Sequence, residues 1–210
     1  MKSPDPITLL KDRFGGEAIV QPEFRGETGV YLPRTRIAEA CRLLKTEGGF
    51  DMLTDLSGVD FPGETPRFEV HYLLYSFSCG RRLRLVTGVP EEDPHVDSVS
   101  GIWATANWHE REAFDMFGLC FDGHPDLRRI LMWDGYPHHP LRKDFPVAGL
   151  PSDLPVTAED AGSVEAAPMA GGPFVATSGT TRATRREPLA CDTAAERDRL
   201  VRDPHRKEEI

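Results

Sequence analysis

The feature that most constrains the fold is a pair of long strand-like segments separated by a very short turn. Residues 67–77 (RFEVHYLLYSF) and 81–89 (RRLRLVTGV) are rich in the β-branched and aromatic residues that favour strands. Only Ser78, Cys79 and Gly80 lie between them, which favours an antiparallel hairpin. We therefore expect a sheet that is built around this hairpin.

Residues 67–77 place apolar side chains on both faces of the expected sheet. Successive side chains of a strand point to opposite faces, so alternate residues share a face. One face receives Phe68, Val70, Tyr72 and Leu74, and the other receives His71, Leu73, Tyr75 and Phe77. This pattern predicts a central strand with helices on one side and a partner or a loop on the other.

The segments before this hairpin indicate an α+β domain. Residues 6–14 are expected to form a short helix, residues 17–24 and 29–33 two strands, and residues 50–60 a third strand. Apolar residues at helical spacing predict a second helix, namely Ile37, Ala40, Cys41 and Leu44. This order lacks the regular alternation of a parallel sheet. We predict a two-layer α+β domain over residues 1–147, with a mostly antiparallel sheet and helices.

A last helix is expected over residues 108–117. Asn107 is a suitable N-cap, and Glu110, three positions later, would complete a capping box. Gly118 would end the helix.

Residues 148–210 differ in composition from the rest of the chain. They are rich in Pro, Gly, Ala, Ser and Thr, and Phe174 is their only aromatic residue. Such a segment buries too little apolar surface to offset the entropy that is lost on ordering. We predict an extended or disordered C-terminal tail, rich in Pro and Gly, that docks on a partner.

Charge and cysteine usage exclude several classes of function. The net charge of −9 at pH 7 argues against a nucleic-acid-binding protein. The chain has no C-x-x-C pair, which argues against a cysteine-ligated cluster. No apolar run is long enough to span a bilayer, and the first residues do not resemble a signal peptide. We expect reduced thiols, a cytoplasmic location and no direct membrane insertion.

The stretch from Gly123 to Val147 and the helix before it permit two enzymatic interpretations. A zinc site would use Cys120, His124 and one or both of His138 and His139, although this spacing matches none of the usual zinc patterns. An acid–base site would combine His109 or His124 with three carboxylates, Glu110, Glu112 and Asp115. The helix dipole and ion pairs with Arg111 or Lys143 explain these carboxylates equally well.

A third interpretation of this stretch is a rigid interaction surface. Its four prolines restrict the backbone, and its aromatic residues offer a large contact area. Its cationic residues suit binding to carboxylates on a partner: Arg128, Arg129, Arg142 and Lys143. The alternative is that the aromatic residues pack beneath a long loop while the arginines face water. The residue types by themselves do not decide between an interaction surface and a loop that packs on its own aromatic residues.

Residues 108–147 resemble a family signature. They follow the pattern W-x-E-R-E-x-x-D-M-F-G-x-x-F-x-G-H-P-D-L-R-R-I-L and then H-P-L-R-K-D-F-P. This pattern is similar to that of the C-subunit family of proton-pumping NADH:quinone oxidoreductase, respiratory complex I. The family usually has glycine just before H-P-L-R-K-D, whereas this chain has His138. A positive φ at that position would strain the turn.

The resemblance implies a subunit that carries no cofactor and has no activity when isolated. FMN, iron–sulfur clusters and quinone would belong to partner subunits, and the chain would pack chiefly against the D and B subunits of the peripheral arm. It would lie on the cytoplasmic side of the bacterial inner membrane, in a complex that couples electron transfer from NADH to quinone with proton translocation. An equivalent subunit of a related membrane-bound hydrogenase or dehydrogenase is the alternative.

The same resemblance assigns no catalytic, cofactor-binding or metal-binding residue to the chain. It makes the charged residues of the signature candidates for partner contacts or structural ion pairs. These candidates are Glu110, Arg111, Glu112, Asp115, His124, Arg128, Arg129, His139, Arg142, Lys143 and Asp144.

Overall fold

The computed structural model describes residues 4–150, 152–153 and 163–164. The chain divides into two units, Met1–Ala166 and Ala167–Ile210, and the second unit lies outside the described residues. The predicted tail, residues 148–210, is therefore described only for residues 148–150 and for two short strands. These are β8 (Ser152–Asp153) and β9 (Ser163–Val164), which pair antiparallel.

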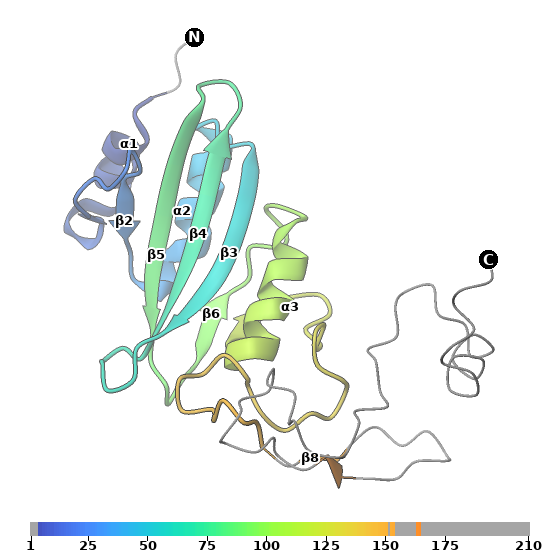
Figure 1. The fold of residues 1–210 in the computed structure, drawn as a ribbon. Coiled ribbons are helices and arrows are strands. Elements are labelled where there is room, and N and C mark those ends of the chain that lie inside the picture. The colour runs from blue at the N-terminus through green and yellow to red at the C-terminus, as the bar shows by residue number, and fades with distance from the viewer. Residues whose placement is uncertain (1–3, 151, 154–162, 165–210) are drawn as a thin grey trace, which may run out of the picture. The chain divides into compact units, whose positions relative to one another are not determined.

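A five-stranded sheet forms the centre of the first unit (Figure 1). Its strands lie in the order β1-β2-β5-β4-β3. All neighbouring strands are antiparallel except β2 and β5, which are parallel. The predicted mostly antiparallel sheet is thus confirmed. The strands are β1 (Ile19–Val20), β2 (Gly29–Tyr31), β3 (Met52–Asp60), β4 (Phe68–Ser76) and β5 (Arg81–Val89).

Strand β4 alternates strictly between buried and half-buried residues, as its sequence predicts. Phe68, Val70, Tyr72 and Leu74 are buried, whereas His71, Leu73 and Tyr75 are half-buried. The buried set belongs to one core together with the apolar side of α2 (Ile37–Thr46), which lies behind the sheet in Figure 1. Burial of these side chains against each other is the main stabilising contribution of this layer.

The first helix, α1 (Pro6–Phe14), begins and ends where its sequence indicates. The carboxylate of Asp5 accepts a hydrogen bond from the Thr8 amide at 3.2 Å, and Gly15 ends the helix with a φ of 56°. Leu10 and Phe14 of this helix reach the same core. Two 3-10 turns, η1 (Gly15–Glu17) and η2 (Arg34–Arg36), follow α1 and precede α2.

The helix α3 (Ala106–Phe117) joins two short strands that its sequence does not predict. These are β6 (His95–Asp97) and β7 (Cys120–Asp122), which pair in parallel. The predicted N-cap and capping box are wrong, because the helix begins after Thr105 and the Glu110 side chain binds a different segment. Gly118 ends the helix as predicted, with a left-handed φ of 77°.

Candidate functional site

The long loop after β7, residues 123–147, is held against the fold by charged residues of α3. Asp115 is the main attachment point, and its carboxylate is fully buried. It accepts hydrogen bonds from Arg129 Nη1 at 2.6 Å and from three successive amides, those of Ile130, Leu131 and Met132, at 3.0, 2.7 and 2.8 Å. One side chain therefore fixes the backbone of a segment that has no regular structure.

These donors also set the charge of Asp115. Burial alone would raise the pKa of its carboxyl, but the hydrogen bonds from the Met132 amide, Arg129 and the Leu131 amide outweigh burial and hold the pKa below its ordinary value. Asp115 is therefore ionised at neutral pH and is unsuited to act as a proton donor there.

Arg111 fastens the same loop from the next turn of α3. Its Nε and Nη2 atoms donate to the carbonyl oxygens of Arg128 and Arg129, each at 3.1 Å, and its guanidinium lies 5.3 Å from the centre of the Trp108 ring. Since Arg111 is buried, these contacts replace the water that its charge would otherwise bind.

Glu110 attaches α3 to the segment before it. Its carboxylate accepts hydrogen bonds from Ser98 Oγ at 2.6 Å and from the Val99 amide at 2.7 Å. Burial raises the pKa of Glu110 to about 7, and the hydrogen bonds oppose this rise. His124 Nε2 lies 4.0 Å from the carboxylate. That nitrogen donates to the Asn107 carbonyl at 3.1 Å, and Nδ1 accepts the Asp126 amide at 3.0 Å, so backbone groups occupy both ring nitrogens.

The end of α3 receives the second half of the loop. Arg142 Nε donates to the Phe117 carbonyl at 2.7 Å, and His139 Nδ1 donates to the Asp115 carbonyl at 3.0 Å. Both side chains pass closely over Gly118, where an added Cβ would lie 2.6 Å from Arg142 Nη2 and 2.7 Å from His139 Nε2. Gly118 is thus required both by its φ and by this close approach. Burial lowers the pKa of His139.

A second carboxylate cluster, which the sequence interpretation missed, holds the loop at Lys143. The buried Asp60 binds Arg67 through two hydrogen bonds of 2.8 and 2.9 Å and accepts the Lys143 amide at 2.7 Å. Arg67 also contacts Glu91 at 2.6 Å and Asp144 at 3.1 Å. The Arg67 contacts hold the pKa of Asp60 below its ordinary value. Asp60 ends one predicted strand, and Arg67 begins the next. If these two strands pair antiparallel, the two residues come to lie close together, and this was the sequence signal from which the ion pair could have been predicted.

The histidines and cysteine of the zinc interpretation do not come together. His124 uses both ring nitrogens on backbone groups, His139 binds Asp115, and Cys120 lies on β7 beside β6. Within residues 4–150, 152–153 and 163–164, no three His, Cys, Asp or Glu side chains are arranged to hold a metal ion.

His138 does not strain its turn. Among the non-glycine residues that the structure describes, only Arg25 has a positive φ. The His138 ring instead packs edge-on against Tyr136 with centroids 5.5 Å apart, and it lies 6.0 Å from the Phe145 ring. The departure from the family pattern therefore adds an aromatic contact to the loop.

The remaining charged residues of the signature face solvent. Glu112 and Lys143 are exposed, Arg128 is exposed and pairs with its neighbour Asp126 at 2.8 Å, and Asp144 is exposed at 61%. Trp108 and Leu131 are each 61% exposed. The structure thus separates the signature into a buried set that binds the loop and a set that is exposed on the surface.

The comparisons with known proteins agree with this signature. Residues 30–151 match the family described as respiratory-chain NADH dehydrogenase, 30 Kd subunit. The chain belongs to this family. The C subunit of NADH-quinone oxidoreductase from Geobacter sulfurreducens is 47% identical over 144 residues, which cover 68% of this chain and 89% of that protein. The C 2 subunit of the same enzyme from Rhizobium meliloti is 46% identical over 153 residues, covering 72% and 84%.

Solved structures share the fold of this 30 kDa family. A trypsin-resistant fragment (1-134) of Nqo5 superposes with a TM-score of 0.53 and 35% identity, covering 57% of this chain and 97% of the fragment. A chain of the membrane-bound sulfane sulfur reductase, an archaeal respiratory membrane complex, superposes with a TM-score of 0.58 at 24% identity, covering 66% and 82%. The second likeness concerns the fold alone. In the described part of this chain, no helix has the length and apolarity that crossing a membrane requires.

Proposed function

We propose that the chain is a peripheral-arm subunit of NADH:quinone oxidoreductase, complex I, that itself holds no cofactor. It packs against the D subunit, which forms the quinone site, with the B subunit nearby, on the cytoplasmic side of the bacterial inner membrane. FMN, the iron–sulfur clusters and quinone reside in partner subunits, and the assembled complex couples electron transfer to proton translocation. The observation that carries this proposal is the 47% identity to a C subunit across 89% of the length of that relative.

The geometry supports a structural role better than a catalytic one. The acid–base hypothesis combines His109 or His124 with three carboxylates that a substrate can reach. His109 Nδ1 instead lies 3.4 Å from Asp55, and of the three carboxylates only Glu112 is exposed, since Glu110 and Asp115 are both fully enclosed. Their partners are a serine hydroxyl, an arginine and backbone amides of the same chain. Such contacts shape a surface for another protein, since they fix a loop whose outer residues remain exposed.

Co-purification tests this proposal. An affinity-tagged full-length chain, expressed in its native host and solubilised with mild detergent, is expected to carry the D and B subunits and NADH:quinone reductase activity. Deletion of the gene should remove that activity and release the D and B subunits from the membrane fraction. The isolated chain should show neither this activity nor stoichiometric metal. Recovery of the chain without these partners, or metal-dependent hydrolase activity, would overturn the proposal.

The second candidate function is that of the equivalent subunit in a related membrane-bound hydrogenase or dehydrogenase complex. The fold that this chain shares with a chain of an archaeal respiratory membrane complex is compatible with this alternative and does not decide between the two. The same co-purification separates the two, because the accompanying large subunits would then include a hydrogenase or another dehydrogenase instead of an NADH-oxidising module.

A further inference from the structure

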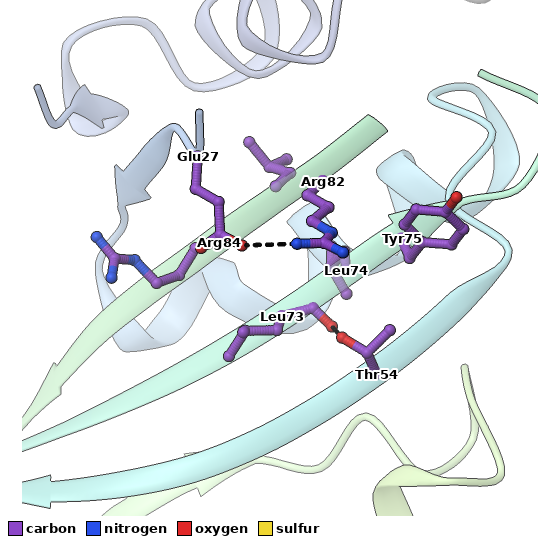
Figure 2. A pocket seen from close by; sticks show the side chains of 8 residues that line it. Glu27, Thr54, Leu73, Leu74, Tyr75, Arg82 and Arg84 are labelled. Atoms are coloured by element: carbon purple, nitrogen blue, oxygen red, sulfur yellow. Dashed lines mark hydrogen bonds and ion pairs between the residues drawn. The ribbon is translucent and has the colours of Figure 1, made fainter. Parts of the chain in front are cut away.

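One face of the central hairpin is uncovered in the described part of the chain. The residues that face α2 are buried, and the opposite face is open to the viewer in Figure 1. There, Leu73 of β4 pairs with Arg84 of β5, and Tyr75 pairs with Arg82 (Figure 2). These side chains border a hollow of about 330 Å³, here called the outer hollow. Its lining also includes Glu27.

The apolar part of the outer hollow continues onto an aromatic pair, the half-buried Tyr75 and the exposed Phe77. The rings of Tyr75 and Phe77 meet edge to face, with centroids 5.1 Å apart and planes 88° apart. Phe77 is 67% exposed, and Leu73 lies two residues before Tyr75 on the same face. Aromatic rings that are already ordered against each other offer a large contact area at a small further loss of entropy. This surface therefore favours an apolar side chain from a partner.

The cationic part of the outer hollow has two guanidinium groups, those of Arg82 and Arg84, but one carboxylate, that of Glu27. Arg84 Nη2 has a long 3.4 Å contact with Gln21 Oε1, and the buried Arg84 Nε has no hydrogen-bond partner among the described residues. Arg82 is 70% exposed, and its ion pair with Glu27 has a separation of 3.7 Å. Glu27 is thus the one carboxylate among the residues that line the hollow, and it pairs loosely with Arg82 alone, in a chain whose net charge is −9.

The position of Arg84 depends on a glycine in the neighbouring strand. A Cβ at Gly29 of β2 would lie 2.3 Å from Gln21 Oε1 and 3.3 Å from Arg84 Nη2. Gly29 therefore leaves room for Arg84 and Gln21 to lie across β2. A buried donor without a partner is unfavourable, and the planar guanidinium binds a carboxylate through two parallel hydrogen bonds. These features indicate that a carboxylate from another molecule completes the site.

We propose that the outer hollow docks a segment of another protein of the complex. That segment presents an Asp or Glu to Arg82 and Arg84 and an apolar side chain to Leu73, Tyr75 and Phe77. The charge distribution argues against a second copy of this chain, because a two-fold contact through this face would bring arginines toward arginines. This inference rests on the proposed function, in that the chain works inside a multisubunit complex.

Site-specific photo-crosslinking tests the position of the partner. Full-length chain with benzoylphenylalanine at position 77 is incorporated into the complex and irradiated, and the linked peptide is sequenced. The expected product joins position 77 to a peptide of another subunit that contains Asp or Glu. Position 61 is the control, since Phe61 is also exposed but lies at the opposite end of the strands, between β3 and β4. No product from position 77, or a product with a second copy of this chain, overturns the inference.

Charge reversal tests the chemistry of the contact. R82E is expected to reduce co-purification of the partner subunits about tenfold or more, because it places a carboxylate where the partner presents one. R13E is the matched control, since Arg13 is also exposed and also pairs with one glutamate, Glu39. If R82E and R13E assemble equally well, this inference fails while the proposed function stands. If the wild-type chain does not assemble, the proposed function fails.

Discussion

At the residue scale, the two buried carboxylates of α3 have opposite electrostatic surroundings. Asp115 receives an arginine and three amides, which hold its pKa below the ordinary value. Glu110 receives a hydroxyl and an amide but no arginine, so burial dominates and raises its pKa to about 7. One carboxylate is therefore an ionised anchor, and the other titrates near neutral pH.

Glu110 is expected to make stability fall as pH rises. Because its folded pKa is about 7 and its ordinary value is 4.5, the folded state binds an extra proton between these values and loses that advantage as pH increases. Between pH 4.5 and 7.5, wild type should lose about 3 kcal/mol of unfolding free energy relative to Glu110→Gln. Urea unfolding at several pH values measures this difference. Parallel pH profiles for the two proteins would contradict it.

Asp115→Asn should destabilise the isolated chain by about 3 kcal/mol, because the amide removes the charge that Arg129 and three backbone donors bind. Glu112→Gln is the control, as Glu112 is exposed on the same helix and its replacement should change stability by less than about 0.5 kcal/mol. Equal unfolding midpoints for the two variants would show that Asp115 does not anchor the loop.

The neighbours Arg142 and Lys143 should behave differently when each is changed to Glu. Both were expected to meet a partner, but Arg142 binds the Phe117 carbonyl and lies 5.2 Å from the Phe68 ring centre. Arg142→Glu should therefore lower the melting temperature of the isolated chain. Lys143→Glu should leave it unchanged and weaken only assembly, because the Lys143 side chain is exposed. A Lys143→Glu protein that assembles as wild type would remove Lys143 from the interface.

At the scale of elements, the contact between β3 and α3 joins the sheet to the site. Gly58 of β3 lies where an added Cβ would be 2.8 Å from the Phe117 ring and 3.1 Å from Leu119 Cδ1. The glycine thus lets the end of α3, with the attached loop, lie directly on the sheet. Thr105, just before α3, adds a hydrogen bond to the Leu53 carbonyl at 3.1 Å.

Gly58→Ala is expected to destabilise the isolated chain by about 2 kcal/mol, since the methyl group overpacks a buried contact between rigid elements. Gly101→Ala is the comparison, because no atom lies within 4 Å of the Cβ it would add. Thermal unfolding of both variants measures the effect. If the Gly58→Ala protein has the same melting temperature as wild type, α3 can shift on β3 without loss of stability, and the prediction is wrong.

At the scale of the whole molecule, the division between a folded domain and a partner-docking tail stays a prediction. The family match ends at residue 151, close to the predicted boundary at residue 147. The composition of the tail indicates that its contribution lies in association, where a tether raises the local concentration of weak contacts.

A chain that ends at Gly149 should therefore melt close to the full-length protein but associate less tightly with the D subunit. Differential scanning calorimetry of the isolated proteins and co-purification of the complex measure the two effects separately. The prediction is wrong if truncation markedly lowers the melting temperature, or if association is the same with and without the tail.

The sequence by itself determined the local elements, because the signals for them are local. The alternation of residues 67–77, the spacing of Ile37, Ala40, Cys41 and Leu44, and the glycines at positions 15 and 118 all mark elements that the structure contains. The family signature was equally readable, since its residues are contiguous. The role of Glu110 could not be predicted in this way. A Glu near the start of a helix gives the same sequence pattern whether its side chain caps its own helix or binds a distant loop.

Only the tertiary structure decided which charges are anchors and which face outward. Glu110 and Glu112 are two residues apart, yet one is enclosed and the other is exposed. The neighbours Arg142 and Lys143 also differ, since Arg142 is half-buried and Lys143 is exposed. Burial of a side chain depends on what the rest of the chain places around it, and those contacts join residues far apart in sequence, such as Asp60 with Lys143. The parallel pairing of β2 with β5 and of β6 with β7 arises in the same way, from long connections that leave no local signal.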